Sequence, residues 1–566
     1  MLDVLFPGQD STERYAVSMS SAAPGAFATM RRLGADLLAA ARVGIVRRGF
    51  YGTALIAIGA LSPAYLPRSS PWWRMLASLR LEGSLSKITG TVVTMAGLLL
   101  VMSAWFALRP LRSSQAGSRS RGPQVYRHVK HWAVLAIWSV PFLLAPPIFS
   151  HDAYSYAAQG WLVHNGINPY YSGPGVLPGA FADQVSWVWR DTPSPYGPLS
   201  MQISHLLLHV FGFDPYWSAV AQRIPALVGV VLIGVCLPRI ATRLHIDPAF
   251  TAWFGTLNPL LIIDFVGGCH NDALMMGLVV LGLWLATIPP ANRTPQTRRR
   301  SWSDGGWWWL LGAVACGVGA SIKQPALLAA YVVPMLARRW SGPGLREGLI
   351  SVSRVLVSML VAIGTFAGIS LWTGLDFGWY NAVSVPGSSN SPAPSTIVGQ
   401  LVRLGLRLAG GDPASRTAID ISHTVFLAIG VVLLAVTALT VARRRPATFV
   451  SWGYLIAAMA SPALHSWYML WGGLTLPLAR PSSRQITVAI WVNFALLGYD
   501  AIDMSLRNNG LAISIAAVIA FLFMTWSHLS SVTVPGRVPE TAAHLEIADV
   551  RGARTGTSGG AKAQDG

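Results

Sequence analysis

The sequence predicts an all-α protein that crosses the membrane many times. Hydrophobic residues make up 52% of its 566 residues and charged residues only 11%, whereas soluble domains carry roughly 25% charged residues. A helix needs about 20 apolar residues to cross a bilayer, and about 14 apolar runs approach that length. In a soluble protein a net charge of +19 would suggest a nucleic-acid partner. Here the Arg residues cluster in short loops, as cytoplasmic loops do, so no nucleic acid is expected.

Each apolar run is expected to be one membrane span. The runs lie near 50–66, 88–108, 132–149, 217–237, 248–266, 270–288, 306–322, 324–337, 349–373, 421–442, 447–460, 467–479, 485–499 and 511–529. Basic clusters orient them, because Lys and Arg concentrate on the cytoplasmic side. These clusters are Arg42, Arg47 and Arg48; Arg109, Arg112, Arg119, Arg121, Arg127 and Lys130; Arg239 and Arg243; Arg293 with Arg298 to Arg300; Arg338 and Arg339; and Arg443 to Arg445. Both termini are therefore expected inside.

Two stretches do not fit simple alternation. Residues 67–87 should lie outside, although they contain the basic residues Arg68, Arg74, Arg80 and Lys87. Residues 198–212 are apolar, but a crossing there would invert every later loop. With a length of about 15 residues, this segment is interpreted as a helix that lies at the outer interface. Residues 150–216 then form one large extracytoplasmic loop.

The start of this loop, SHDAYSYAAQGWLVHNGINPYY at 150–171, is unsuited to a lipid-facing surface. It places Asp152 at the mouth of a span beside several aromatic residues, and Trp161, Trp187 and Trp189 follow in the same loop. A carboxylate at the water boundary, with aromatic surfaces on which a sugar can stack, indicates chemistry on a carbohydrate. Asp152 also suits the N-cap of the following helix, which is compatible with catalysis because a capped carboxylate is a positioned one.

Most other ionisable residues near span ends, apart from the basic clusters, fall on the same side. They and their neighbours are Asp264, His270 and Asp272 in DFVGGCHND; Lys323 and Gln324 in SIKQP; His465, Trp467 and Tyr468 in SPALHSWYML; and Asp500 with Asp503. Ionisable groups at membrane depth are costly and mark function, so one cavity open to the outside is expected. A transporter more often places such groups at mid-bilayer within repeated halves, and no internal repeat is evident.

Several of these residues also have structural interpretations. Asp264 suits a helix end paired with a cation, and Lys323 suits snorkelling to the interface. Arg223 lies at the start of a span, where a structural ion pair explains it as well as a phosphate ligand does. His205 and His209 have the i, i+4 spacing of metal-binding helices. No acidic partner joins them, so they are interpreted as interfacial polar residues rather than as a zinc site.

The chemistry that suits these residues is a single displacement on a lipid-linked sugar. Nucleotide donors are not expected outside the cell, and neither GxGxxG nor GxxxxGK[ST] occurs. Asp152 would deprotonate the incoming hydroxyl, and the lipid phosphate would leave from the opposite face through an oxocarbenium-like transition state. Cations would stabilise that phosphate, and the candidates are Lys323, Arg223, His270 and His465. No metal or other cofactor is expected.

At these residues the chain resembles the multi-span glycosyltransferases that use polyprenyl-phosphate sugars and share the C-type glycosyltransferase (GT-C) fold. Within them it is most similar to the α-1,6-mannosyltransferases that elongate the lipomannan core of lipoarabinomannan. The resemblance rests on FSHDAYSYAAQGWLVHNGINPY (149–170), SPYGP (194–198), NPLLIIDFVGGCHNDALMMGL (258–278), SIKQPALL (321–328) and SPALHSWYMLW (461–471). It covers most of the chain, except the first 45 residues and the tail from about Ser530.

The resemblance implies a plasma-membrane enzyme whose active site faces the extracytoplasmic side. Its donor would be β-mannosyl phosphopolyprenol and its acceptor a mannosylated glycolipid, extended as an α-1,6-mannan with inversion and without a metal. The family's catalytic carboxylate falls on Asp152. The family fold also places two interfacial helices in the first large loop, which fits 153–165 and 198–212. Of the two related enzymes that act on proximal and distal mannan, the proximal one is favoured.

The resemblance also implies the domain organisation. A cytoplasmic segment (1–45) precedes two additional spans with a basic loop (46–131). These two spans count as additional because many members of the wider fold begin with the helix that enters the catalytic loop, which is the third span of this chain. The glycosyltransferase core follows (132–529, with the catalytic loop at 150–216), and then a tail (530–566) expected to be disordered and cytoplasmic.

Sugar and acceptor contacts are expected from the polar and aromatic residues around Asp152. They are Tyr154, Tyr156, Trp161, Asn168, Tyr170, Tyr196, Asp264, Asn271, Asp272, Gln324, Trp467 and Tyr468. Two alternatives stay open: transfer of another polyprenyl-phosphate sugar, arabinose or glucose, and a flippase for lipid-linked sugars.

Overall fold

In the computed structural model the described residues form helices joined by turns and irregular segments, with no strand among them, which confirms the all-α class. The described residues are 26–110, 129–289, 302, 306–338, 340, 342–382, 391–410 and 416–506. The predicted span at 511–529 and the tail from Ser530 lie outside them.

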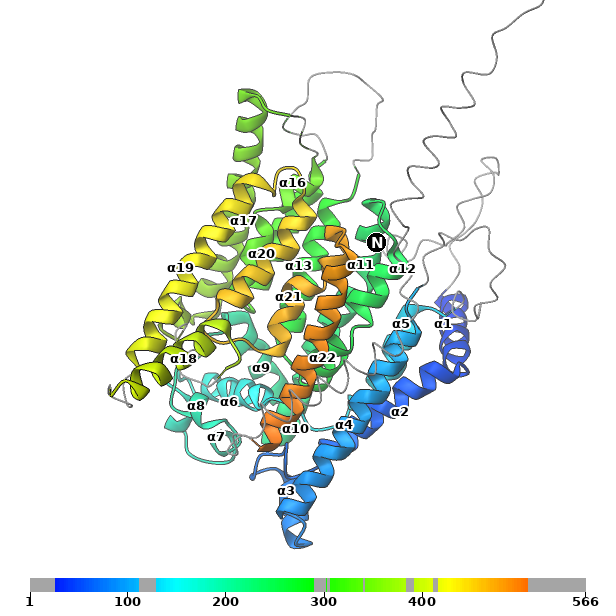
Figure 1. The fold of residues 1–566 in the computed structure, drawn as a ribbon, viewed down its shortest axis with the longest axis vertical. Coiled ribbons are helices and arrows are strands. Elements are labelled where there is room, and N and C mark those ends of the chain that lie inside the picture. Colours follow the sequence, from blue (N-terminus) through cyan, green and yellow to red (C-terminus); the bar gives the residue numbers. More distant parts are fainter. Residues whose placement is uncertain are drawn as a thin grey trace, which may run out of the picture. The chain divides into compact units, whose positions relative to one another are not determined.

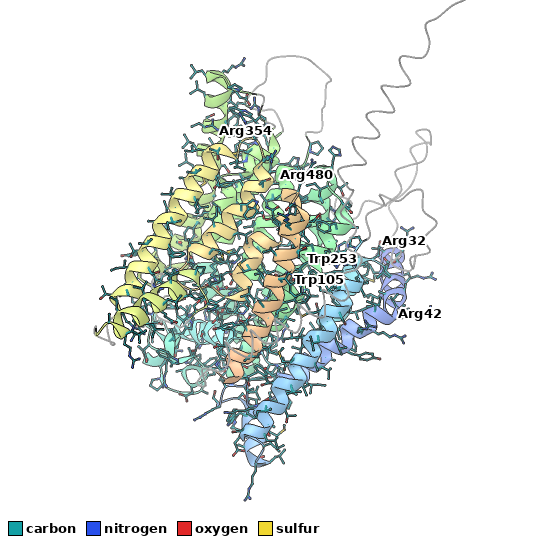
Figure 2. The ribbon with its side chains drawn as sticks, viewed as in Figure 1. Arg32, Arg42, Trp105, Trp253, Arg354 and Arg480 are labelled. Atoms are coloured by element: carbon teal, nitrogen blue, oxygen red, sulfur yellow. The ribbon has the colours of Figure 1, made fainter. Side chains whose placement is uncertain are left out.

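The first helices form a hairpin that joins the later part of the chain through stacked tryptophans. These helices are α1 (Ala26–Ala41), α2 (Gly44–Gly59), α3 (Pro71–Ser78), α4 (Ser84–Ala107) and α5 (His131–Ser139), which continues as a 3-10 turn, η3 (Val140–Phe142). The rings of Trp105 and Trp253 stack 4.7 Å apart, and each indole N–H donates to the other residue's carbonyl at 2.9 and 2.7 Å (Figure 2). The hairpin is thus fixed to the segment that follows α12.

The loop predicted at 150–216 contains several helices that gather at one end of the bundle, in the lower part of Figure 1. They are α6 (Asp152–His164), η4 (Pro174–Val176), α7 (Ala180–Asp183), α8 (Trp187–Arg190), α9 (Pro198–Val210) and α10 (Pro215–Ala221). Proline opens α9 and α10, where its missing N–H costs nothing. Helices are thus confirmed at 153–165 and 198–212, and their position at the interface stays a prediction.

The middle of the chain carries the ionisable motifs between helices. Its elements are α11 (Arg223–Arg243), α12 (Pro248–Thr251), the π-helices η5 (Ala252–Thr256) and η6 (Leu261–Gly267), α13 (Asp272–Ala286), α14 (Trp308–Ala320), η7 (Gln324–Ala326), α15 (Leu327–Ala330) and α16 (Val333–Ala337). The motif DFVGGCHND thus connects η6 to α13, and SIKQP connects α14 to η7.

The last part of the described chain contains the longest apolar helices. Its elements are α17 (Leu345–Thr373), η8 (Gly378–Ala382), α18 (Pro394–Leu408), α19 (Thr417–Thr440), α20 (Pro446–Ala460), η10 (Ser466–Tyr468), α21 (Met469–Gly473), η11 (Leu476–Ala479) and α22 (Ser483–Leu506). Only 22% of the most apolar window of α17 and 11% of that of α19 is buried against protein. These two helices therefore present apolar surface outward, as lipid-facing helices do.

By length and composition, five helices of the described residues can cross a membrane, or six if one bent pair counts as a span. The five are Ser84–Ala107, Pro215–Arg243, Leu345–Thr373, Thr417–Thr440 and Ser483–Ser505. Shorter apolar helices stand at other predicted spans: His131–Phe142, Asp272–Ala286, Trp308–Ala320, Gln324–Ala337 and Pro446–Ala460. The protein is therefore a multi-pass membrane protein.

Three predicted spans are not straight helices. At 248–266 the chain bends by 52° between Thr256 and Leu261, where Pro259 lacks the N–H that a continuous helix needs. At 324–337 and 467–479 it forms short helical pieces, and Pro325, Pro334 and Pro477 each stand in the first turn of one of them. Irregular backbone of this kind within a membrane protein is tolerated where it is buried in protein or lines a cavity.

Candidate active site

Asp152 begins α6 directly after an irregular turn. Phe149, three residues earlier, has a left-handed backbone with φ of +62°, which a bulky residue adopts only under constraint. The hydroxyl of Ser150 accepts the backbone N–H of Asp152 at 3.0 Å. The N-cap of α6 is His151 and not Asp152, and no side chain caps the helix there. The carboxylate of Asp152 is therefore not used as the N-cap that the sequence offered as an alternative.

The carboxylate of Asp152 faces two phenols and an imidazole. Its Oδ2 lies 3.5 Å from the hydroxyl of Tyr156, 3.5 Å from that of Tyr196 and 3.6 Å from Nδ1 of His270. The side chain is 16% exposed. Burial raises the pKa of Asp152 from 3.8 to about 6, although the cation of Lys323 opposes the shift. A carboxylate of this kind is ionised at neutral pH and basic enough to accept a proton.

His270 is held against Asp152 by its backbone and by an aromatic stack. The preceding Cys269 has φ of +59°, so the chain turns sharply between η6 and α13. The imidazole is fully buried and stacks on Trp467, whose ring centroid is 3.6 Å away, and Trp467 stacks in turn on His465 at 4.5 Å. Neither ring nitrogen of His270 makes a hydrogen bond within the described residues. The carboxylate of Asp152, 3.6 Å from Nδ1, is the ion-pairing partner within reach of this imidazole.

Tyr156, one of these two phenols, also contacts Asn271, which in turn contacts Ser200. The hydroxyl of Tyr156 lies 3.3 Å from Oδ1 of Asn271, and the Asn271 amide donates to the Ser200 hydroxyl at 3.3 Å. All three side chains are buried. Because the Tyr156 hydroxyl has one proton, it donates to either Asp152 or Asn271 and accepts from other groups. The phenol is thus a shared donor whose direction depends on the charge of Asp152.

A buried ion pair lies beside this group. Nζ of Lys323 donates to both carboxylate oxygens of Asp272, at 3.0 and 2.9 Å. The indole N–H of Trp471 donates to the same carboxylate at 2.7 Å. The ammonium also lies 4.5, 5.4 and 5.6 Å from the ring centroids of Tyr468, Trp471 and Tyr196, within cation–π distance. Lys323 is therefore a well-supported cation, and Tyr196 lies close both to it and to Asp152.

The SPYGP and SIKQP motifs pack against each other, and this packing brings Tyr196 close to Lys323. The backbone N–H groups of Gly197 and Leu199 donate to the carbonyls of Ile322 and Ser321, both at 2.9 Å, and the Gln324 amide donates to the carbonyl of Pro195 at 3.0 Å. A Cβ at Gly197 would lie 2.3 Å from the Ser321 oxygen. Only glycine permits this approach, which places Tyr196 against the end of Lys323.

Some residues expected at the site lie elsewhere. Arg223 is buried, and its guanidinium donates to the carbonyls of Val266, Leu143 and Gly267 at 2.8, 3.0 and 3.2 Å. It supports the backbone that precedes His270, through these three carbonyls. Both carboxylate oxygens of Asp264 are buried without a hydrogen-bond partner among the described residues.

Four residues of the catalytic loop serve its packing. Tyr154 is fully buried in an apolar cluster of α6, α9 and α10, against which Trp161 also packs. Trp161 itself stacks on Phe181 at 5.0 Å. The Asn168 amide donates to the Leu375 carbonyl at 3.2 Å, and the Tyr170 hydroxyl donates to the Tyr196 carbonyl at 2.9 Å. The last two bonds hold the loop and Tyr196 in place, so these residues position the site.

Trp471 and Ser200 were not among the residues expected from the sequence, yet both bind site side chains directly. Trp471 follows Tyr468 by three residues, which is about one helical turn. This i, i+3 spacing would have predicted that the two side chains lie on the same face. Ser200 is one of several polar residues of α9, and only its contact with Asn271 distinguishes it from the others.

Comparisons with known proteins show what this chain is similar to. A family model described as alpha-(1->6)-mannopyranosyltransferase, N-terminal domain, matches residues 46–339. A probable alpha-(1->6)-mannopyranosyltransferase of Mycolicibacterium smegmatis is 28% identical over 531 residues, which cover 88% of this chain and 92% of the relative. An alpha-(1->6)-mannopyranosyltransferase of Mycobacterium tuberculosis is 29% identical over 77% of this chain and 78% of its own length. Alpha-(1->6)-mannopyranosyltransferase B of Corynebacterium glutamicum is 26% identical over 84% and 78%. No solved structure matches the chain.

Proposed function

The chain belongs to the alpha-(1->6)-mannopyranosyltransferase family, and on that premise we propose that it transfers mannose from polyprenyl phosphomannose to an α-1,6-mannan acceptor. The observation that carries the proposal is the placement of Asp152. A half-buried carboxylate with a pKa of about 6 lies against Tyr156, Tyr196 and His270. The elongated product would be lipomannan, and the proximal part of the mannan is the favoured place of action.

The proposed reaction is an inverting single displacement. Asp152 removes the proton of the acceptor's primary hydroxyl as that oxygen attacks the anomeric carbon of the donor. The new oxygen–carbon bond forms as the bond from that carbon to the phosphate oxygen breaks, and the polyprenyl phosphate leaves with the electron pair. A β-linked donor then gives an α-linked product, and the proton ends on Asp152. General base catalysis of this kind contributes about 10²- to 10⁴-fold.

Lys323 is the proposed cation for the departing phosphate. An ammonium has three N–H donors, and Lys323 directs two contacts to the oxygens of Asp272. The third donor lies near Tyr468, and we propose that it turns to a phosphate oxygen without breaking the ion pair. The role of Asp272 is then to hold Lys323 charged and oriented, and not to contact the sugar. His270 and His465, joined through Trp467, are proposed on the phosphate side as well.

The remaining polar and aromatic residues near Asp152 are proposed to contact the sugars. They are Tyr156, Tyr196, Asn271, Gln324, Trp467 and Tyr468. We propose positioning roles for six further residues, because their contacts or their burial fit support of the backbone better than contact with substrate. They are Arg223, Tyr154, Trp161, Asn168, Tyr170 and Asp264.

The proposed membrane arrangement follows the GT-C pattern, with about 14 spans and a core at 132–529 behind two additional spans. The active site would face the extracytoplasmic side. This is supported by the position of basic residues: Arg354 and Arg480 lie toward the end of the bundle opposite α6–α10 (Figure 2), as cytoplasmic Arg does in membrane proteins. A carbohydrate acceptor outside the cell would reach α6 directly.

The test is mannosyl transfer from synthetic polyprenyl phosphomannose to a short α-1,6-mannoside by the purified protein in EDTA. Wild type should form an α-1,6 linkage, identified by NMR of the product, and Asp152→Asn should not. Asp183→Asn is the matched control, since this aspartate lies in the same loop, is 52% exposed and makes only a 3.6 Å surface ion pair with Arg190. It should keep full activity.

Other outcomes identify the alternatives. Transfer from polyprenyl phosphoarabinose or phosphoglucose, but not from phosphomannose, would show that the donor is one of these other lipid-linked sugars. Movement of a labelled polyprenyl phosphosugar across a proteoliposome bilayer without sugar transfer would show that the protein is a flippase and not a transferase.

A further inference from the structure

Three histidines meet at the end of α6 that is remote from Asp152. His164 is the last residue of α6, and His205 and His209 stand one turn apart on α9. One ring nitrogen from each lies within 4.8 Å of the other two. In the sequence alone, only the i, i+4 pair of His205 and His209 is evident, without an acidic third ligand. The third imidazole comes from a different helix, about 40 residues earlier in the chain.

The close packing of α6 on α9 brings these imidazoles together. A Cβ at Gly160 would lie 2.7 Å from the carbonyl carbon of Ser204 and 2.8 Å from the backbone nitrogen of His205. The helices therefore touch backbone to backbone at this point. His164 follows Gly160 by four residues, one turn along the same face, and thus reaches the His205 and His209 side chains.

The geometry of the pair on α9 fits a metal ion. Nε2 of His205 and Nε2 of His209 are 3.1 Å apart. Two imidazole nitrogens bound to one tetrahedral zinc at about 2.0–2.1 Å are separated by about 3.3 Å. The pair is therefore already near the required separation, and a ring rotation of His164 completes three ligands without movement of either helix.

The surroundings of the cluster restrict these side chains and leave one side accessible. His164 stacks on Trp161 at 5.2 Å, and Phe213 lies 4.6 and 5.0 Å from the rings of His164 and His209. His164 and His209 are exposed and His205 is half-buried.

We propose that His164, His205 and His209 form a binding site for a divalent transition-metal ion, with zinc as the best fit. Neutral imidazoles suit zinc, and three of them leave a fourth position for water. Such an ion joins the C-terminal end of α6 to α9. It lies about 18 Å from Asp152, because 12 residues of helix separate His164 from that carboxylate. Its role is to hold α6, whose other end carries the base, and not to take part in the transfer.

The experiment is a titration of the chelator-treated, full-length protein in detergent with Zn²⁺ alone, followed by calorimetry and by thermal unfolding. Wild type should bind one equivalent and unfold at a higher temperature with Zn²⁺. His164→Gln and His209→Gln should each weaken binding by more than the about 10- to 100-fold that loss of an outer-shell partner costs, and should lose the thermal shift. His245→Gln, at an exposed histidine between α11 and α12, is the control and should bind as wild type does.

Cobalt gives a second measurement that does not depend on stability. Co²⁺ bound to three imidazoles and a water should give the visible absorption of a four-coordinate site in wild type and in His245→Gln, and none in the other two variants. If wild type binds no Zn²⁺, or if His164→Gln and His209→Gln retain the same stoichiometry and affinity, the proposal is wrong. The proposal rests on the packing of α6 and α9 alone, so the result of the metal-binding test does not depend on whether the protein transfers mannose.

Discussion

Replacing Asp152 by Asn tests the assignment of the base, because the change removes the charge and keeps the size. Ionised Asp152 is costly in its half-buried position. The difference between a pKa of 3.8 and one of about 6 corresponds to about 3 kcal/mol of unfavourable free energy when the carboxylate is charged. Asparagine never carries that charge, so Asp152→Asn should unfold at the same temperature as wild type or a higher one at pH 7.

The sign of the pH dependence follows from the direction of the shift. Since the folded state raises the pKa of Asp152, the stability penalty is fully present above about pH 6 and disappears as the pH falls toward 4. Activity should have the opposite pH dependence. The base must be ionised, so kcat/KM should fall about tenfold for each pH unit below about 6. Wild type should therefore gain stability from this group over the range in which it loses activity.

The assay compares wild type, Asp152→Asn and Asp183→Asn in transfer rate, thermal unfolding and pH profile. We expect Asp152→Asn to be slower by about 10²- to 10⁴-fold with unchanged donor affinity. Two results would refute the reasoning: a rate within tenfold of wild type, or a lost rate together with a fall in unfolding temperature, which would mean that the carboxylate supports the fold. A pH profile of wild type without a break near 6 would also show that Asp152 does not set the rate.

Three further predictions concern the residues around the base. Lys323→Met should lower stability by about 3–5 kcal/mol, because Asp272 becomes a buried charge without its cation, and Lys323→Met with Asp272→Asn should recover most of the loss in chemical denaturation. Gly197→Ala should cost about 1–3 kcal/mol and most of the activity, since its Cβ would meet the Ser321 oxygen at 2.3 Å; an unfolding temperature equal to that of wild type would contradict the predicted clash. Arg223→Gln should lower the unfolding temperature and leave the donor KM unchanged, because its guanidinium binds backbone carbonyls; a raised donor KM at wild-type stability would instead make it a phosphate ligand.

Local patterns in the sequence were sufficient for the class of protein and for some of the side chains that meet around Asp152. Apolar runs predict helices, and helices occupy most of the predicted spans. Proline residues stand where single spans are bent or broken, but the presence of Pro259 and Pro334 did not by itself predict which spans would be discontinuous. The motif blocks around Asp152, His270 and Lys323 do come together, through the contacts of Asp152 with His270 and Tyr196 and of Tyr196 with Lys323.

Side-chain roles within those blocks could not be read from the sequence. Arg223 and Lys323 are both cations at span ends, yet one binds three backbone carbonyls and the other a carboxylate. The difference depends on which way each side chain points when its helix is packed, and a linear pattern contains no such information. Asp272 likewise became the partner of Lys323 through a contact across 51 positions.

The sequence by itself determined that this chain is a helical membrane protein, and it singled out the motif that contains Asp152, the proposed base. These properties depend on hydrophobicity, charge and short-range spacing, which are local. Tertiary structure decided that Tyr196 lies close to both Asp152 and Lys323, that Arg223 supports backbone, and that His164 joins His205 and His209. Those contacts join residues far apart in the chain, and only the close packing of helix on helix, set by small residues such as Gly160 and Gly197, brings them within reach.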